Sequence, residues 1–356
     1  MPPLVQLLPT SPKPKAVDLF SGCGGLTCGL DLAGFDVVGA VEMEPKAVDT
    51  YLLNFPNVHV WKQDIRKVRS KDMLAALGLK QGELDLLAGC PPCQGFSSIN
   101  TKNGKITIDN ENNNLVYQFL RLIKELKPKT VMMENVPALA ADGRMTKFLA
   151  AIGKLGYYNG PDAVQVLDVS DYGVPQRRKR MVLLTSTKGP VTYAQPIAER
   201  ATVQQFIGGL EKPGETGDAM HDVVERRSEA VMTKIRAIPH DGGSRSDLPD
   251  EMQLPCHQRC NGFTDIYGRM AWNDVAPTIT GGCTNPSKGR FLHPEQDRAI
   301  TPREAALLQT FPGNYKFNTP INKEKVALMI GNALPPLFIK AHAVQISAAL
   351  QRHAVA

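Results

Sequence analysis

The fold is decided by residues 84–94, which read Leu84-Asp85-Leu86-Leu87-Ala88-Gly89-Cys90-Pro91-Pro92-Cys93-Gln94. The first six residues form a short apolar run, which is typical of a fully buried strand in a parallel sheet. Two prolines then fix the backbone and end the strand. Cys93 follows at the carboxyl edge of the sheet, where open α/β sheets bind their ligands. A lone cysteine is usually a packing residue, so a nucleophile here requires a base, an acid and a cofactor elsewhere in the chain.

Strand and helix signals alternate from residue 15 to about residue 185. Apolar runs predict strands at residues 16–20, 37–42, 58–61, 84–88, 130–134, 164–167 and 181–185. Helices are predicted after the glycine-rich turn as far as residue 32, from the proline at 45, and at 115–126, 302–309 and 336–351. This alternation predicts the α/β class, with a doubly wound, mostly parallel sheet covered by helices on both faces.

The composition of the sequence changes near residue 186. From there to about residue 300, glycine, proline, serine and threonine are frequent and the apolar periodicity is weak. We therefore expect a catalytic and cofactor-binding domain at 15–185 plus 321–356, and a second, smaller and irregular domain at 186–320. Residues 1–14 are proline-rich and lack an apolar segment, so we interpret them as a disordered lead-in.

Composition limits the class of protein. At 356 residues, with 42% hydrophobic and 21% charged residues, the chain has an ordinary globular composition. No apolar run approaches the roughly 18 residues that a membrane span needs. Seven cysteines at irregular spacing argue against a disulfide framework and for a reducing, cytoplasmic location. A net charge of +6 permits a polyanionic partner without requiring one.

A second motif, Asp18-Leu19-Phe20-Ser21-Gly22-Cys23-Gly24-Gly25, joins the first predicted strand to the first helix. Its glycines allow a ligand to approach the backbone closely. Glu42, about twenty residues further on, is placed to bind a ribose diol, and Asp64-Ile65 could meet an adenine amino group and ring face. These contacts suit S-adenosylmethionine. A nicotinamide dinucleotide stays open, although the third glycine of its usual motif is missing.

From about residue 15 to 345 the chain resembles the C5-cytosine DNA methyltransferases, because six motifs occur in that family's order. Besides the glycine-rich turn, they are Pro91-Pro92-Cys93-Gln94-Gly95-Phe96-Ser97, Glu134-Asn135-Val136, Gln176-Arg177-Arg178-Lys179-Arg180, Arg303-Glu304 with Leu308-Gln309-Thr310-Phe311-Pro312, and Gly331-Asn332-Ala333-Leu334-Pro335-Pro336. The resemblance implies methyl transfer from S-adenosylmethionine to C5 of a cytosine flipped out of double-stranded DNA. It also implies that residues 186–320 are a target-recognition domain.

The family's catalytic roles fall on four residues. By resemblance, the Cys93 thiolate attacks C6, Glu134 binds N3 and the exocyclic amine and supplies a proton, Arg180 reaches O2, and Arg178 orders Cys93 and nearby phosphates. The cofactor contacts implied are Phe20, Gly22, Gly24, Glu42, Met43, Asp64, Ile65, Pro92, Leu115 and Asn332. The DNA contacts implied or suggested are Gln94, Ser97, Arg177, Arg245 and Arg259, with Arg226, Arg227 and Arg269 as further candidates.

Other functions stay open on the sequence alone. Cys90 and Cys93 form a C-x-x-C pair that could belong to a metal or redox module, with Cys23 and Cys28 or with Cys256, His257 and Cys260. A dinucleotide oxidoreductase would leave Cys93, Glu134 and the arginines without a joint role. Transfer RNA is the alternative substrate for the same chemistry. We expect a nucleoid-associated monomer, and a cognate restriction endonuclease is compatible with the sequence.

Overall fold

A computed structural model describes residues 12–92, 115–223, 226–253, 265–319 and 322–354. Its centre is a seven-stranded sheet with the order β3-β2-β1-β4-β5-β7-β6. Strands β1 to β5 run parallel to one another, whereas β7 pairs antiparallel with both β5 and β6. The predicted doubly wound, mostly parallel α/β fold is confirmed.

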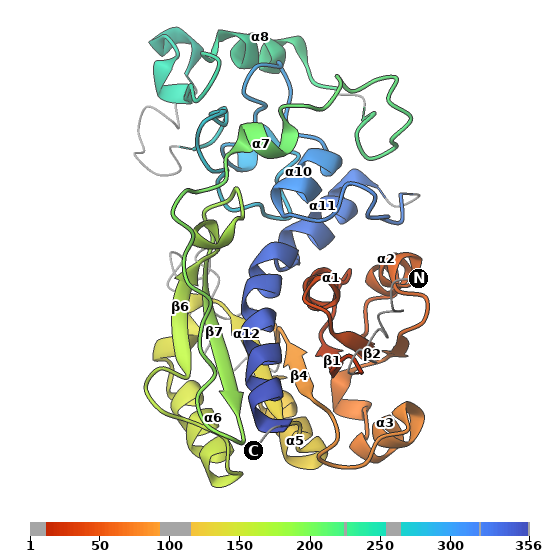
Figure 1. The fold of residues 1–356 in the computed structure, drawn as a ribbon. Coiled ribbons are helices and arrows are strands. Elements are labelled where there is room, and N and C mark those ends of the chain that lie inside the picture. Colours follow the sequence, from red (N-terminus) through yellow and green to blue (C-terminus); the bar gives the residue numbers. More distant parts are fainter. Residues whose placement is uncertain (1–11, 93–114, 224–225, 254–264, 320–321, 355–356) are drawn as a thin grey trace, which may run out of the picture.

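The strands are short and lie close to their predicted positions. They are β1 (Lys15–Leu19), β2 (Asp36–Glu42), β3 (His59–Lys62), β4 (Leu86–Gly89), β5 (Thr130–Asn135), β6 (Val164–Asp168) and β7 (Lys179–Ser186). The helices around the sheet are α1 (Gly25–Leu32), α2 (Pro45–Asn54), α3 (Ser70–Leu77), α5 (Leu115–Leu126), α6 (Gly143–Lys154) and α12 (Pro336–Ala354). Above the sheet lie α7 (Val203–Ile207), α8 (Glu229–Ala237), α10 (Pro302–Leu308) and α11 (Lys323–Asn332) (Figure 1).

Two apolar layers enclose the sheet, because successive residues of a strand face opposite sides. Val17 and Leu19 of β1 pack on the face that α3, α5 and α6 cover, whereas Ala16 packs on the face of α1 and α12. In the same way Leu87 of β4 belongs to the first layer and Leu86 to the second. The short apolar runs therefore behave as predicted for strands that are buried on both sides.

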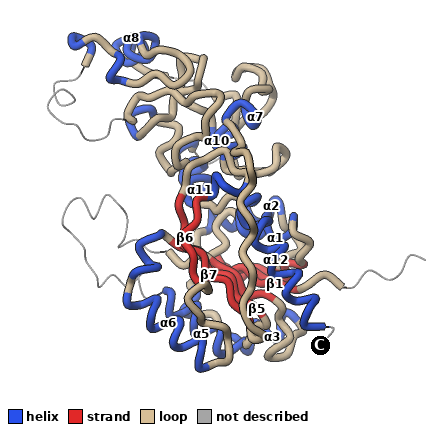
Figure 2. Tube along the Cα trace, turned by 60° about the vertical axis from the view of Figure 1, so that its left-hand side comes forward, coloured by secondary structure: helices blue, strands red, loops and turns tan. Residues whose placement is uncertain are grey.

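The region that follows β7 has little regular structure. Figure 2 shows it mostly as loops, with α7, α8 and α10 as short helices. Its main apolar cluster contains Val203, Ile207 and Phe311 together with Cys23 and Cys28 of the glycine-rich turn and α1, so it is continuous with the sheet domain. Helix α11 contributes Val326, Ala327 and Ile330 to this upper cluster, whereas α12 packs on the sheet.

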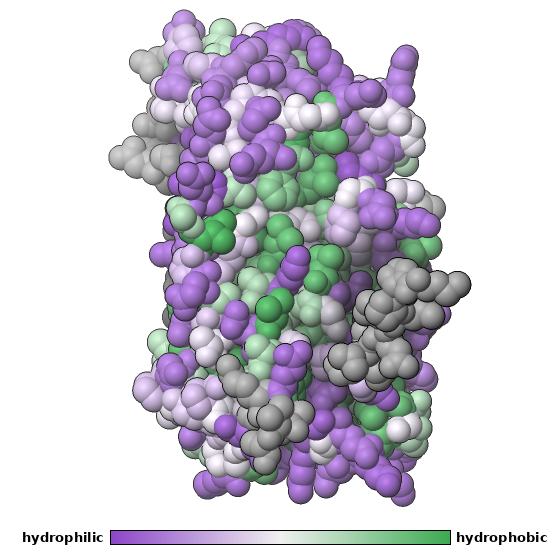
Figure 3. All heavy atoms as spheres, in the orientation of Figure 1, coloured by the Kyte–Doolittle hydropathy of each residue, from purple (hydrophilic) through white to green (hydrophobic). Residues whose placement is uncertain are grey.

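One helical stretch, Lys323–Gln351, is long and apolar enough by length and composition to cross a membrane. Yet 61% of its most apolar window is buried inside the fold. Phe338 and Ile346 pack on the sheet, and Ala333 interrupts the helix between α11 and α12. Figure 3 shows apolar surface gathered along the middle of one face, over the region of α11 and α12. We interpret the stretch as a helix of the protein core.

A buried acid stands in the middle of the sheet, at Asp18 of β1. Its Oδ2 accepts a hydrogen bond from the Thr27 hydroxyl at 2.7 Å, and that hydroxyl also lies 2.9 Å from the Tyr51 hydroxyl. Its Oδ1 has no hydrogen-bond partner among the described residues. Burial raises the pKa of Asp18 to about 7, so the fold favours the neutral carboxyl.

The Asp18→Asn variant is expected to gain stability relative to the wild type as the pH rises. The carboxyl ionises at about 3.8 when unfolded and holds its proton to about 7 when folded, so its stabilising contribution is lost as the pH rises through that interval. Asparagine has no proton to lose. Denaturant unfolding at about pH 5 and about pH 8 measures the difference. Asp36→Asn, on the exposed start of β2, controls for the lost charge; an identical difference at both pH values contradicts the assignment.

Candidate active site

The candidate site lies at the carboxyl edge of β1, β2, β4 and β5. Leu19 of β1 is level with Val41 of β2 and Gly89 of β4, and Gly89 is level with Met133 of β5. The residues that follow these positions therefore converge at one edge of the sheet. They comprise the glycine-rich turn, Glu42, the Cys90–Pro92 segment and Glu134.

The glycine-rich turn is tight and left-handed at three positions. Phe20, Gly22 and Gly24 have φ angles of 61°, 54° and 95°. A Cβ on Gly24 would lie 2.6 Å from the Tyr315 hydroxyl, so a side chain cannot fit there. A Cβ on Gly22 would meet nothing within 4 Å, which leaves open space beside the backbone. The turn thus packs against the protein on one side and is free to approach a ligand on the other.

Glu42 at the end of β2 organises this turn. Its Oε2 accepts from the Gly22 N–H at 2.8 Å, and its Oε1 accepts from the N–H groups of Met43 and Glu44, each at 2.8 Å. Oε2 accepts only one of these hydrogen bonds, so it can still accept one from a ribose hydroxyl. Ser21 is 6% exposed, and its hydroxyl has no partner among the described residues. The remaining acceptor on Glu42, the unpaired Ser21 hydroxyl and the space beside Gly22 fit a nucleoside cofactor.

The other predicted cofactor residues lie at varied depths. Met43 is 64% exposed beside Glu42, Asn332 is exposed at the end of α11, and Pro92 and Leu115 are partly buried. The side chain of Ile65 is 3% exposed and packs in the core. Asp64 accepts hydrogen bonds from the backbone N–H and the guanidinium of Arg66, which lower its pKa. Asp64 is therefore ionised and already paired at neutral pH.

The catalytic edge holds a buried ion pair. Glu134 of β5 lies 2.7 Å from Nε of Arg180 of β7, and the two side chains are 8% and 17% exposed. Burial raises the pKa of Glu134, and the positive charges of Arg180 and Arg178 only partly offset this effect. A raised pKa lets this carboxyl hold a proton that it can give to a substrate.

Arg178, two residues before Arg180, is 5% exposed. Its Nη1 donates to the carbonyl of Ile279 at 2.9 Å and its Nη2 to the carbonyl of Gly331 at 3.0 Å. Burial is the main cause that lowers its pKa, to about 9, so the guanidinium stays charged at neutral pH. The sequence motif identified Arg178 as a candidate, but it could not identify these backbone partners.

The predicted nucleophile lies outside the described residues, as do Gln94, Ser97 and Arg259. The described segment before Cys93 ends at Pro92, just past β4. The side-chain amide of Asn135 donates to the carbonyl of Pro91 at 2.8 Å. This bond holds Pro91 beside the residue that follows Glu134. Cys90 also faces the carboxyls: burial, followed by the charges of Glu134 and Asp18, raises its pKa well above the ordinary value. Cys90 is thus a protonated thiol at neutral pH.

The arginines proposed for DNA differ in their exposure. Arg177 is more than half exposed and lies 3.2 Å from Asp274. Arg245 is only 9% exposed, and Arg269 is fully buried. The guanidinium of Arg269 donates to the carbonyls of Ile235, Ile238, His293 and Gln296 and to Asp297. We therefore assign Arg269 to the interior of this region and not to its DNA contacts.

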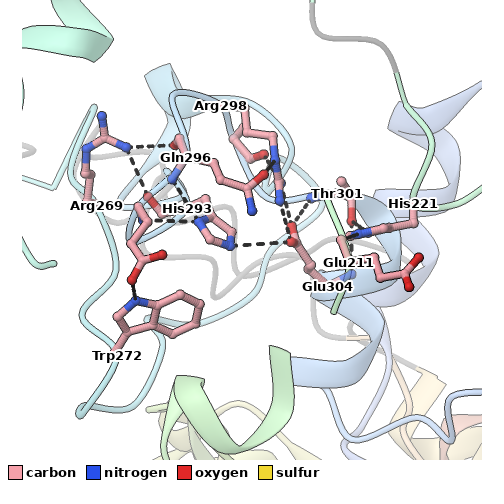
Figure 4. A network of polar contacts seen from close by, with 11 residues as sticks. Glu211, His221, Arg269, Trp272, His293, Gln296, Arg298, Thr301 and Glu304 are labelled. Atoms are coloured by element: carbon pink, nitrogen blue, oxygen red, sulfur yellow. Dashed lines mark hydrogen bonds and ion pairs between the residues drawn. The ribbon is translucent and has the colours of Figure 1, made fainter. Parts of the chain in front are cut away.

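Figure 4 shows the polar network that surrounds Arg269. Glu304 of α10 pairs with the Arg298 guanidinium at 2.7 and 2.8 Å and accepts from the Thr301 N–H at 2.7 Å. Nδ1 of His293 lies 3.1 Å from the Glu295 N–H and 3.0 Å from the Gln296 N–H. Sequence reasoning assigned Glu304 a structural role but missed Arg298 and His293, since their spacing follows no helical or strand period.

A metal centre finds no support in the residues that the structure describes. They contain no group of three or more His, Cys, Asp and Glu side chains that could hold a metal ion. Cys23, Cys28, Cys90 and Cys283 are free thiols. Cys93 and the segment with Cys256, His257 and Cys260 lie outside the described ranges.

The fold and the site define the class first: the chain is an enzyme of the doubly wound, class I methyltransferase type. Two solved structures share the fold. A DNA modification methyltransferase encoded within an E. coli prophage matches with a TM-score of 0.73 and 24% identity, over 95% of this chain and 100% of that chain. Entamoeba histolytica methyltransferase EhMeth matches with a TM-score of 0.65 and 15% identity, over 95% and 99%.

Sequence comparison then gives the family. The model of the C-5 cytosine-specific DNA methylases matches residues 15–348, so the chain belongs to that family and is a DNA (cytosine-5)-methyltransferase. Type II methylase M.HgiDII of Herpetosiphon aurantiacus is 37% identical, over 90% of this chain and 91% of the relative. Type II methyltransferase M1.HphI of Haemophilus parahaemolyticus is 33% identical, over 91% and 84%. The family resemblance drawn from the six motifs is confirmed.

Replacing Glu42 with alanine is expected to weaken S-adenosylmethionine binding by about 10- to 100-fold, because a charged acceptor is lost and the turn loses its anchor. Calorimetric titration of the cofactor measures the change. Glu44→Ala, two residues further along the chain and exposed, is the matched control and should bind as the wild type does. Unchanged affinity in Glu42→Ala removes this residue from the cofactor site.

Proposed function

We propose that this enzyme transfers the methyl group of S-adenosylmethionine to C5 of a cytosine flipped out of a specific double-stranded DNA sequence, through a covalent bond between Cys93 and C6. The observation that carries the proposal is the buried Glu134–Arg180 pair at the edge where the chain leads to Cys93. Bound at the glycine-rich turn, the cofactor would supply an electrophilic methyl group on a sulfonium. Every other requirement of the reaction falls on residues of this chain.

Cytosine C5 is a weak nucleophile, so the ring must first be activated. In the proposed sequence the Cys93 thiolate bonds to C6 while Glu134 donates its proton to N3, which neutralises the charge that develops on the ring. Arg180 keeps Glu134 oriented and would hydrogen-bond O2. C5 then takes the methyl group, a base removes the C5 proton, the bond to Cys93 breaks to release the thiolate, and N3 returns its proton to Glu134. Burial of Glu134 and Arg178 keeps water from the pair.

Double-stranded DNA is the substrate that we favour over transfer RNA. The relatives at 37% and 33% identity carry the names of type II enzymes, and they match nearly the whole chain. Residues 186–320 supply a separate, loop-rich region that fits a reader of DNA sequence, with Arg177 and Arg245 as proposed contacts besides Gln94, Ser97 and Arg259. We propose a cytoplasmic, nucleoid-associated monomer, with a restriction endonuclease as its natural companion.

Replacing Cys93 with alanine or serine is expected to abolish methylation, because the ring is no longer activated. A DNA duplex that carries 5-fluorocytosine at the target should trap the wild-type enzyme as a denaturant-stable adduct, since fluorine at C5 cannot leave as a proton. Cys283→Ala, which removes a buried thiol that the proposed reaction does not use, should still form the adduct. Turnover in Cys93→Ala, or no adduct with the wild type on methylatable DNA, refutes the covalent route.

Replacing Glu134 with glutamine is expected to lower the single-turnover rate by about 10²- to 10⁴-fold, the usual contribution of a positioned acid. The raised pKa predicts the pH profile. The wild-type rate should fall as the pH rises through that pKa, since the protonated form is the active one, whereas the variant should lack this limb. Glu125→Gln on the surface of α5 should keep the wild-type profile. A profile shared by wild type and Glu134→Gln contradicts the assignment.

A further inference from the structure

Two glutamines join the recognition region to the catalytic edge through a buried amide pair. Gln176 precedes β7 and Gln309 follows α10, 133 positions further along the chain, and both are fully buried. Nε2 of Gln176 donates to Oε1 of Gln309 at 2.7 Å. Amide groups buried this deeply are retained only when their hydrogen bonds are made, so the partners on either side are informative.

Each amide uses its other end on a backbone group. Oε1 of Gln176 accepts from the N–H of Ile279 at 2.8 Å. Nε2 of Gln309 donates to the carbonyls of Ile330 and Ala333 at 2.6 and 3.1 Å, at the end of α11. Every donor therefore points the same way along the chain of bonds, from the Ile279 N–H to the carbonyls at the end of α11. Neither amide can turn over without setting two oxygen atoms or two N–H groups against each other.

The same residue, Ile279, is also held at its carbonyl by Arg178. Arg178 donates to the carbonyl of Ile279, while Gln176 binds the N–H of that residue. Two further hydrogen bonds join the same segments. The Arg177 N–H donates to the carbonyl of Ala276 at 2.9 Å, and the Thr278 hydroxyl donates to the carbonyl of Arg177 at 2.7 Å. The segment from Ala276 to Ile279 is thus fastened along residues 176–178.

The end of α11 completes the arrangement. The second guanidinium nitrogen of Arg178 donates to the carbonyl of Gly331. A Cβ on Gly331 would lie 2.2 Å from the carbonyl carbon of Thr280, so only glycine lets α11 come this close. Arg178 and the Gln176–Gln309 pair therefore hold the same two backbone segments, one from the recognition region and one from the end of α11.

We propose that Gln176 and Gln309 are positioning residues that set the place of the Arg178 guanidinium, and through it the Glu134–Arg180 pair. Arg178 is close enough for its charge to lower the pKa of Glu134, so a shift of its guanidinium changes the acid directly. Residues 280–285 follow Ile279 within the recognition region, residues 186–320. A displacement of these residues would shift Ile279 and the Arg178 guanidinium that binds it, and so would change the pKa of Glu134. This inference rests on the proposed function, because it assumes that Glu134 acts as the acid.

The first test replaces each glutamine with methionine, which keeps the length of the side chain but removes its hydrogen bonds. We expect the single-turnover rate constant to fall by about 10²-fold, the loss that a displacement of about 1 Å brings at a reacting centre. Cofactor affinity of Gln176→Met should stay near the wild-type value, since Gln176 bonds to Gln309 and Ile279 and not to the segment around Asn332, whereas Gln309 binds the Ala333 carbonyl beside Asn332. Rates are measured at saturating DNA and cofactor, below the melting temperature of every variant.

A matched control separates positioning from general loss of stability. His221 is 3% exposed, and its ring nitrogens lie 2.9 Å from the Thr301 hydroxyl and 2.8 Å from the Glu211 carbonyl, within the recognition region and away from Arg178. His221→Phe removes two buried hydrogen bonds and should lower the melting temperature while keeping the rate constant. If Gln309→Met loses stability like His221→Phe and keeps the wild-type rate constant, the positioning role is refuted.

The second test uses Gln309→Glu. The introduced carboxylate would face the carbonyls of Ile330 and Ala333 with an oxygen and break the polarity of the pair. Once protonated, it can donate to one carbonyl and still accept from Gln176. The ratio of variant to wild-type rate constants should therefore rise as the pH is lowered from about 9 to about 6. A ratio that does not rise overturns the inference.

The 5-fluorocytosine adduct distinguishes failure of this inference from failure of the proposed function. If the wild type forms no adduct, the covalent route itself is wrong. If the wild type forms the adduct and the Gln176→Met and Gln309→Met variants form it at the same rate, the chemistry stands and the positioning role is lost. Slow adduct formation in both variants at saturating cofactor supports the inference.

Discussion

The constraint on which the site depends is the burial of one carboxyl between two arginines. Moving charged groups out of water is expensive, and a buried pair recovers this free energy only with good geometry and further hydrogen bonds. Glu134 and Arg180 meet at 2.7 Å, and Arg178 has backbone carbonyls on both terminal nitrogens. Because burial outweighs the arginines in setting the pKa of Glu134, the same packing that excludes water also prepares the acid.

This constraint explains why polar contacts join the two halves of the molecule in addition to the apolar cluster that they share. Arg178 needs acceptors, and the Ile279 and Gly331 carbonyls supply them from the recognition region and from α11. Those backbone segments must then be held in place, which the Gln176–Gln309 pair does. The cofactor turn is tied in similarly, because the Tyr315 hydroxyl donates to the carbonyl of Cys23 at 2.6 Å. The polar contacts give direction, which apolar packing alone cannot give.

The sequence predicted the sheet well because buried parallel strands are continuous apolar runs with clear ends, as in β4 and β5. It identified Glu42, Glu134 and the arginines because they follow such strands or match motifs in order. It did not predict the pairing of Gln176 with Gln309, or of Arg298 with Glu304, since no local period links such residues. Asp18 was read only as part of a motif, because its burial depends on α1 and α2 packing above it.

The irregular region needs a different source of order, and Arg269 shows what it is. A fully buried guanidinium offers five donors, and here four of its acceptors are backbone carbonyls. Every residue has a carbonyl, so Arg269 can hold the backbone at residues 235–238, at the end of α8, and at residues 293–296 whatever side chains these residues carry. Loops fixed through their backbone leave their side chains free for recognition. The exposed side chains of a region built in this way can change while the Ile279 backbone held by Arg178 stays where it is.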